Sequence, residues 1–329
     1  MGAYKTFRGS ENGKIQEGSF QKDLDLSDVL IEITHSGLCG TDVHYKNADI
    51  ALGHEGVGIV KEVGSHVRLF KPGDRVGWGY INHSCGHCKY CLTGMETFCA
   101  EREIYGEHNF HQGSMGSHVI WEENFIFHIP EAISSEHAAP LMCGGATVFN
   151  ALKMYNARPT DRIGIIGVGG LGHLAIQYAA KMGCEAVVFS GTTSKKEEAE
   201  KLGATEFVAT KGASKLELEK KIDHLLVTSA SPPDWDLYIP VLAPQATIYP
   251  LTVDSGNISF PYMPLIQSGF KIQGSMVAAR QIHREMLEFS ALHGIKPITQ
   301  SFPLSSDGIE QAFKTLEGGK MRYRAVLAA

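Results

Sequence analysis

Hydrophobic and polar positions change their rhythm near residue 146. Before that point, Gly, Pro, Asn and Asp separate short apolar runs such as DVLIEITHSGL, EGVGIVKEVG, GDRVGWGYI and GSHVIWEENFIFHIP. These runs are rich in β-branched and aromatic residues and are bounded by turn formers, which is typical of short β-strands. We therefore expect a mainly β, loop-rich domain over residues 1–146.

After residue 146, strand and helix patterns alternate. RIGIIGV (162–168) predicts a short buried strand, and Leu171, Leu174, Ala175 and Tyr178 then recur at helical spacing. Strands or short apolar runs follow at 185–190, 206–210, 223–229, 245–251 and 270–276, with a polar helix at 194–203. This alternation predicts a doubly wound parallel sheet and an α/β fold class. The tail from about 280 contains one amphipathic helix, REMLEFSAL, and a final pair of elements.

Composition excludes several classes of partner. Of the 329 residues, 43% are hydrophobic and 20% are charged, the net charge is −6, and no Lys/Arg block is longer than a pair. Nucleic acid and anionic membranes are therefore poor partners, and no apolar run is long enough to span a membrane. The seven cysteines are an odd number, and the N-terminus lacks the apolar core of a signal peptide. We therefore expect metal-ligating thiols in a reducing, cytoplasmic location.

Four of the cysteines stand together in the run SCGHCKYCLTGMETFC. Cys85, Cys88, Cys91 and Cys99 have the spacing C-x2-C-x2-C-x7-C, and four thiolates so close in sequence can surround one tetrahedral Zn²⁺. The alternative is two disulfides in a small secreted domain, which nothing else in the chain supports. Because a four-cysteine site has no open coordination position, we expect this zinc to be structural.

A glycine turn lies between the strand at 162–168 and the helix that follows it. Gly167, Gly169 and Gly172 fit G-x-G-x-x-G in the context that dinucleotide-binding turns require. Gly167 allows the tight turn, Gly169 lets the backbone approach a pyrophosphate, and Gly172 lets the helix pack closely on the sheet. Together with Gly170 and Leu171, these residues form the candidate cofactor-binding turn. The alternative is a purely structural turn.

The end of the second strand of this domain distinguishes the two nicotinamide cofactors. NAD sites place an acid there, whereas this chain reads SGTTSKK (190–196) and has no acid before Glu197. Hydroxyl and ammonium groups, here Ser190, Thr192 and Lys195, suit the 2′-phosphate of NADP(H). The alternative is that the lysines are only the solvated start of a helix.

Three further residues indicate a second metal site. Cys39 lies in GLCGTDVH, His54 in GHEGVG and Cys143 in PLMCGGAT, each among glycines where a side chain can project into a cleft. Taken singly, a buried Cys or His is more often a core residue than a ligand. Taken together, two cysteines and a histidine leave the open coordination position of a catalytic zinc.

With these motifs in this order, the sequence resembles the zinc-dependent medium-chain alcohol dehydrogenases over essentially the whole chain. GVGGLGHLAIQYAAKMG followed by SGTTSKKEEAEKLGA is most similar to the NADP-dependent cinnamyl alcohol dehydrogenase group. The resemblance implies a GroES-like catalytic domain at 1–146 with two zinc sites and a Rossmann NADP-binding domain at 147–279. It also implies that 280–329 returns to the catalytic domain and that the protein is a homodimer.

The resemblance assigns roles to single residues. The catalytic zinc would be held by Cys39, His54 and Cys143, with Glu55 able to approach it and Asp42 orienting the histidine. Thr41 and His44 would relay a proton, Arg324 would lie near the cofactor, and Trp78 and Tyr80 would line the substrate cleft. Only fourteen residues separate Cys39 from His54, so the loop after His44 is shorter than in most relatives.

The implied reaction is hydride transfer between NADP(H) and a small aldehyde or ketone, aromatic or of medium chain length. One alternative is a biosynthetic NADPH-dependent reductase of an iminium or conjugated double bond, in which the relay residues are often altered. A non-enzymatic zinc- or NADPH-binding protein is another, which the three-ligand set disfavours. Cys184, left over from both sets, is expected to be a buried thiol.

Overall fold

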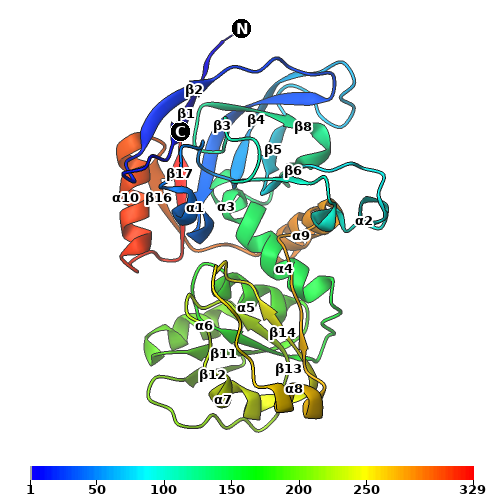
Figure 1. Ribbon diagram of the computed structural model, residues 1–329, viewed down its shortest axis with the longest axis vertical. Coiled ribbons are helices and arrows are strands. Elements are labelled where there is room, and N and C mark those ends of the chain that lie inside the picture. Colours follow the sequence, from blue (N-terminus) through cyan, green and yellow to red (C-terminus); the bar gives the residue numbers. More distant parts are fainter. Residues whose placement is uncertain (1) are drawn as a thin grey trace. The chain divides into compact units, whose positions relative to one another are not determined.

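The computed structural model describes residues 2–329, which form two compact units (Figure 1). The first unit runs to Ala146 and resumes with Val277–Ala329, and the second is Thr147–Met276. Each unit has its own sheets and its own hydrophobic core. Among the helices of the described residues, none combines the length and the apolar character needed to cross a bilayer.

The first unit is mainly β, as predicted. Its strands are β1 (Tyr4–Arg8), β2 (Gln16–Phe20), β3 (Asp28–Leu38), β4 (Gly56–Val63), β5 (Arg75–Trp78), β6 (Ile81–His83), β7 (Glu103–Ile104), β8 (His118–Glu122), β9 (Ile126–His128), β16 (Thr299–Pro303) and β17 (Arg324–Ala328). Seven of them form one sheet in the order β16-β17-β3-β4-β5-β9, with β8 also paired to β3. β3 pairs antiparallel with β4, β8 and β17, so it joins segments that are distant in sequence.

Helices of different lengths connect these strands. They are α1 (Gly40–Tyr45), α2 (Lys89–Leu92), α3 (Ser135–Pro140), α9 (Arg280–His293) and α10 (Ser306–Glu317), and α4 (Ala146–Lys153) begins at the boundary between the units. Between α3 and α4 the chain forms a π-helical turn at Leu141–Gly145. α3 packs against β3, β4 and β17.

The tail contains one element more than the predicted pair after the amphipathic helix. β16 and β17 are parallel, and α10 connects them. Ser305 caps α10, because its side-chain oxygen accepts a hydrogen bond from Gly308 N at 3.2 Å. Ile309, Ala312 and Phe313, at helical spacing, join Leu38 and Leu52 in the core of the first unit.

The second unit contains the predicted doubly wound sheet. Its strands are β10 (Arg162–Ile166), β11 (Glu185–Ser190), β12 (Glu206–Ala209), β13 (Ile222–Val227), β14 (Leu242–Pro250) and β15 (Lys271–Ile272). They are all parallel, in the order β12-β11-β10-β13-β14-β15. The chain therefore reverses its winding direction between β10 and β13, which is where such sheets bind ligands.

Four helices accompany this sheet: α5 (Gly172–Lys181), α6 (Lys196–Leu202), α7 (Trp235–Tyr238) and α8 (Tyr262–Ser268). α5 packs against β10 and β11, α6 against β12, and α8 against β14. Phe189, Leu225, Tyr238 and Ile248 are among the buried residues that form the core on which α7 also packs. The strand–turn–helix junctions between β10 and α5 and between β11 and α6 carry the candidate cofactor residues.

Candidate functional site

Two thiols, an imidazole and a carboxylate meet in the interior of the first unit. The ligand atoms of Cys39, His54, Glu55 and Cys143 all lie within 4.8 Å of one another. Cys39 Sγ is 3.3 Å from His54 Nε2, and that nitrogen is 3.9 Å from Glu55 Oε1. These residues come from the start of α1, the segment before β4, and the turn between α3 and α4, so the tertiary fold assembles the cluster.

The start of α1 places Cys39 and Asp42. Cys39 Sγ accepts a hydrogen bond from Thr41 N at 3.3 Å, and Asp42 Oδ2 accepts one from Cys39 N at 2.9 Å. The two residues thus form a reciprocal capping box at the N-terminus of the helix. Donors and the helix N-terminus both favour the thiolate form of Cys39, which is the form that ligates metals.

Asp42 also fixes the orientation of His54. Its second oxygen, Oδ1, is 3.0 Å from His54 Nδ1, and both side chains are fully buried. Because a carboxylate only accepts hydrogen bonds, Nδ1 donates its proton to Asp42, and Nε2 is the ring nitrogen that faces Cys39 and could bind a metal. A carboxylate behind the outer nitrogen is the usual support of a zinc-ligating histidine.

Glu55 and Cys143 complete the cluster. Cys143 lies in the π-helical turn, a form that is frequent at functional sites. Glu55 is fully buried against Gly37 of β3, where a Cβ atom would come within 1.9 Å of Glu55 Oε2. Glu55 Oε1 accepts a hydrogen bond from Arg324 Nη2, whereas Oε2 has no hydrogen-bond partner among the described residues.

Charges in the cluster are strongly coupled. A hydrogen bond from Cys143 lowers the pKa of Cys39 well below its usual range, although burial acts in the opposite direction. The same hydrogen bond, together with burial, raises the pKa of Cys143 well above its usual range. Burial raises the pKa of Glu55 to about 7, with Arg324 opposing the rise. In His54, burial lowers the pKa, but Asp42 and Cys39 outweigh it and raise the pKa overall.

This donor set fits Zn²⁺. Thiolates, imidazole and carboxylate are the groups that bind zinc, and one Glu55 oxygen accepts no hydrogen bond from residues 2–329. Ordinary Zn–S and Zn–N bonds in a tetrahedron place sulfur and nitrogen about 3.6 Å apart, close to the 3.3 Å between Cys39 Sγ and His54 Nε2. Cys39 and burial favour the protonated form of Cys143, and its thiol would release that proton when the metal binds.

The four clustered cysteines also form a compact group. The separation between sulfurs is 3.9 Å for Cys85 and Cys91, 3.6 Å for Cys88 and Cys91, and 3.6 Å for Cys99 and Cys85. A tetrahedral zinc with four ordinary Zn–S bonds requires about 3.8 Å. All seven cysteines of the chain are free thiols, so the disulfide alternative is not present in the structure. Cys184 is buried, and burial raises the pKa of its thiol to about 11.

The other residues expected near the catalytic zinc differ in how deeply they are buried. Thr41 is half-buried beside Cys39, and His44 follows one turn later on α1 and is exposed. Tyr80 is half-buried and edge-on to the His54 ring, with 5.6 Å between ring centroids. The expectation that Trp78 lines a cleft is wrong, because Trp78 is fully buried and packs over Gly56, where a Cβ atom would lie 2.1 Å from its ring.

Glycines shape the turn between β10 and α5 in the second unit. Gly167 has φ +95°, a conformation that favours glycine. A Cβ atom on Gly172 would come within 1.9 Å of Gly167 O, so only glycine fits there. At Gly169, a Cβ atom would meet no described atom within 4 Å, so the backbone is open to a ligand on that side. Gly170 and Leu171 lead from there into α5.

The SGTTSKK segment reaches back to this turn. Lys195 Nζ donates a hydrogen bond to Val168 O at 2.6 Å, so its ammonium group lies beside the glycine turn. Ser190 ends β11, and the hydroxyl of Thr192 is 2.8 Å from that of Ser194. Arg324, which is also expected near the cofactor, lies in the first unit and is a buried partner of Glu55.

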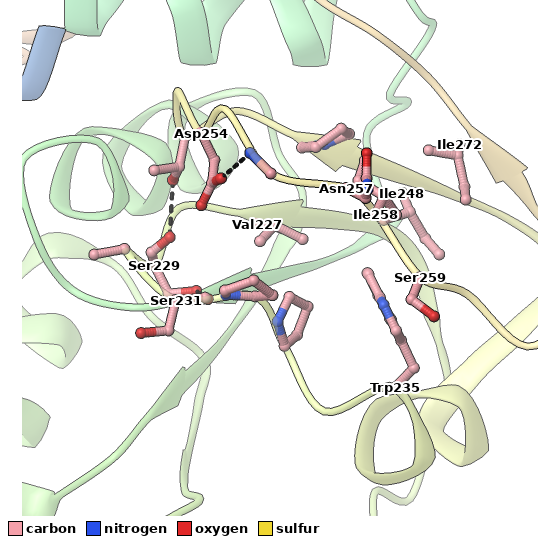
Figure 2. A pocket seen from close by; sticks show the side chains of 16 residues that line it. Val227, Ser229, Ser231, Trp235, Ile248, Asp254, Asn257, Ile258, Ser259 and Ile272 are labelled. Carbon is pink, nitrogen blue, oxygen red and sulfur yellow. Dashed lines mark hydrogen bonds between the residues drawn. The ribbon is translucent and has the colours of Figure 1, made fainter. Parts of the chain in front are cut away.

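A cavity of about 520 Å³ in the second unit was not foreseen from the sequence (Figure 2). Val227, Pro250 and Ile272, which line it, stand at the carboxyl ends of β13, β14 and β15. Trp235 and Ile258 add apolar surface, and polar side chains including Ser229 and Asp254 lie on its other side (Figure 2). A Cβ atom on Gly167 would meet Ser229 Cα at 3.4 Å, so the cavity adjoins the glycine turn. Its only sequence signal was the series of buried strands that end there.

Comparison with known proteins agrees with this architecture. The chain matches the family described as "Alcohol dehydrogenase GroES-like domain" over residues 25–131 and that described as "Zinc-binding dehydrogenase" over residues 170–291. It is 35% identical over 321 residues to "Probable formaldehyde dehydrogenase AdhA" of Bacillus subtilis (strain 168), covering 93% of this chain and 91% of that protein. To "Aldehyde reductase AdhA" of Synechocystis sp. (strain ATCC 27184 / PCC 6803 / Kazusa) it is 34% identical over 328 residues, covering 96% of each.

Solved structures show the same similarity. The chain superposes on CAD from Helicobacter pylori complexed with NADP(H) with a TM-score of 0.86 and 27% identity, covering 99% of this chain and 98% of that one. Together, the two family matches and the full-length relatives define the class: the chain belongs to the zinc-dependent medium-chain alcohol dehydrogenase family and is an oxidoreductase.

Proposed function

We propose that the protein is a zinc-dependent alcohol dehydrogenase or aldehyde reductase that transfers hydride between NADP(H) and an aromatic or medium-chain aldehyde or ketone. The observation that carries the proposal is the buried cluster of Cys39, His54, Glu55 and Cys143. Two thiolates and an imidazole leave open the position that a catalytic zinc needs. The aldehyde-related names of the relatives favour a carbonyl substrate over an iminium or a conjugated double bond.

The chain's own residues would hold the metal, orient its histidine ligand and transfer a proton. Zinc would supply Lewis-acid catalysis and NADP(H) the hydride chemistry. Cys39, His54 and Cys143 would hold the metal, while Asp42 keeps the imidazole proton on Nδ1. The Thr41 hydroxyl would exchange a proton with the substrate oxygen, and exposed His44 would exchange it with solvent.

We assign both zinc sites to the first unit and the binding of NADP(H) to the second. The first unit would be the catalytic domain, with a second, structural zinc at Cys85, Cys88, Cys91 and Cys99, and with residues 280–329 returning to it. The second unit would bind NADP(H), with the pyrophosphate at Gly167–Gly172 and the nicotinamide half toward the cavity at the ends of β13 and β14. The seven free thiols support a reducing, cytoplasmic location.

The proposal is tested by NADPH consumption against a panel of aldehydes and ketones. Cys39→Ala should abolish turnover while retaining the zinc of the four-cysteine site, so zinc content should fall from two ions per chain to one. A chelator that removes the zinc of the Cys39 site should have the same effect on wild type. Full turnover in Cys39→Ala would refute the role of the cluster, and an inactive wild type would refute the substrate class.

Cofactor preference is a separate prediction. Lys195→Ala removes the ammonium group beside the glycine turn and should raise KM for NADPH about tenfold, because a hydrogen bond between charged groups contributes about 1.5 kcal/mol. KM for NADH should change little. Lys181→Ala, at the exposed far end of α5, is the matched control. A wild-type enzyme that prefers NADH would contradict the assignment of the SGTTSKK segment.

We also propose a homodimer formed through the second unit. β15 is the last strand of its sheet and leaves one edge unpaired. Exposed apolar side chains gather nearby, at Ile258, Tyr262, Met263, Ile266 and Ile272. Two such edges related by a two-fold axis are self-complementary, which favours a second copy of the chain as the partner.

A further inference from the structure

Tyrosine rings enclose the proposed ligand His54. The ring of Tyr105 is stacked on the imidazole, with 4.7 Å between centroids and 28° between planes. Tyr80 contacts the imidazole edge-on at 85°. Tyr105 is 8% exposed, so its ring is fixed in the interior. The imidazole plane is therefore held by packing as well as by its hydrogen bond to Asp42.

The hydroxyl of Tyr105 contacts the groups on both sides of His54. It accepts a hydrogen bond from Gly53 N at 3.0 Å, immediately before the histidine in the chain. It also lies beside the carboxylate of Asp42. Burial and this carboxylate together raise the pKa of the Tyr105 hydroxyl well above its usual range. One side chain thus contacts the backbone that carries His54, the face of its ring and the carboxylate that orients it.

Other residues hold Tyr105 from behind. Its backbone N donates to Tyr80 O at 2.9 Å, and the ring of Tyr45 meets it edge-on at 5.2 Å. Gly106 leaves the space that Tyr45 needs, since a Cβ atom there would come within 2.0 Å of the Tyr45 ring. Tyr105 is therefore a rigid support, and a movement of its ring would be transmitted to His54.

We propose that Tyr105 is a positioning residue for the zinc ligand His54. Its ring sets the plane of the imidazole, and its hydroxyl ties Gly53 and Asp42 into one arrangement around it. The inference rests on the proposed zinc site, and it adds a residue that neither the motifs nor the metal-binding cluster includes. Outer partners of metal ligands typically change metal affinity about 10–100-fold when they are removed.

The test measures metal binding directly. Tyr105→Leu removes the stacked ring and the hydroxyl, and should weaken zinc binding at the Cys39 site about 10–100-fold in competition with a chelator. It should also shift the visible spectrum of Co²⁺ bound there, because ligand geometry changes. Tyr105→Phe keeps the ring but removes the hydroxyl, so its zinc affinity should lie between those of the wild type and Tyr105→Leu. Asp42→Asn provides the reference for a lost orienting group.

Controls separate positioning from general destabilisation. Tyr249→Phe, in the second unit, removes a different buried hydroxyl, which is 3.0 Å from His224 Nδ1, and should leave zinc affinity and the Co²⁺ spectrum unchanged. Wild-type affinity and spectrum in both Tyr105 variants would overturn the inference. If Tyr105→Leu does not fold, as judged by loss of the four-cysteine zinc, an unchanged Tyr105→Phe is sufficient to overturn it. Wild type with only one zinc would instead refute the proposed function.

Discussion

At the scale of single residues, Asp42 connects three features of the site. Its two oxygens contact Cys39 N and His54 Nδ1, so one carboxylate caps a helix and orients a ligand on another segment. Glu55 and Arg324 form a second buried pair next to it. Because these charges are fully desolvated, removing one partner costs more than the pair contributes to stability. Single substitutions here should therefore affect metal binding and folding together.

His283 gives a prediction about pH at this scale. It is 3% exposed and stacked on Phe127 at 4.1 Å, and Glu96 and Arg280, which are paired with each other, line the small cavity beside it. Burial, with a contribution from Arg284, lowers the pKa of His283 to about 3. Below about pH 6.5 the unfolded chain therefore binds a proton that the folded chain does not, and stability falls as the pH falls.

His283→Phe should remove this part of the pH dependence. Between pH 6.5 and pH 5 the wild type should lose about 1.6 kcal/mol of unfolding free energy more than the variant, because the unfolded histidine is half protonated at pH 6.5 and almost fully protonated at pH 5. Denaturant unfolding at both pH values measures the difference. His66→Phe, at an exposed position of the same unit, should keep the wild-type slope. Parallel curves for wild type and His283→Phe would contradict the prediction.

At the scale of elements, the cysteine loop supports a helix that begins far away in sequence. α9 starts after Ala279, which has no side chain that can cap it. Glu96, inside the loop, supplies the missing acceptor: its Oε1 receives hydrogen bonds from Arg280 N at 2.6 Å and from Arg280 Nε at 2.9 Å. A carboxylate at this end of a helix also interacts favourably with its dipole. The cysteine loop therefore stabilises the start of α9 as well as its own structure.

Cys91→Ser should therefore disturb both elements. We expect the variant to lose the four-cysteine zinc, to melt at a lower temperature and to exchange amide hydrogens faster at the start of α9, because Glu96 is no longer held. Zinc content and hydrogen exchange measure these effects. Cys184→Ser, another buried thiol, should retain both zinc ions. Unchanged exchange in α9 after zinc loss would show that the two elements are independent.

At the scale of the whole molecule, exposed apolar side chains of the second unit indicate where a second copy of the chain would bind. The second unit carries apolar side chains around α8 and the unpaired edge of β15. Ile266→Glu places a charge among them and should convert a dimer into a monomer, as measured by light scattering. Leu292→Glu, an exposed leucine on α9, should leave the mass unchanged. A wild-type monomer would refute the proposed dimer.

Local patterns were sufficient for much of the fold. The alternation after residue 146 predicted the parallel sheet, because each buried strand and its amphipathic helix are encoded within about thirty residues. α10 was missed, although Ser305 and the helical spacing of Ile309, Ala312 and Phe313 gave a usable signal. The expected cleft position of Trp78 was wrong because the sequence of a strand does not show which of its faces is buried.

The sequence by itself determined the two features that are local in the chain: the four-cysteine loop and the glycine turn. Their chemistry depends on the spacing of a few neighbouring residues. The rest of the fold sets only the orientation of these segments. The tertiary structure decided the rest of the candidate site. Cys39, His54 and Cys143 meet because β3 pairs with β4 and α3 packs on both, and β17 brings Arg324 to Glu55. Tyr105 and the cavity of Figure 2 became visible only then, because both depend on contacts between distant segments.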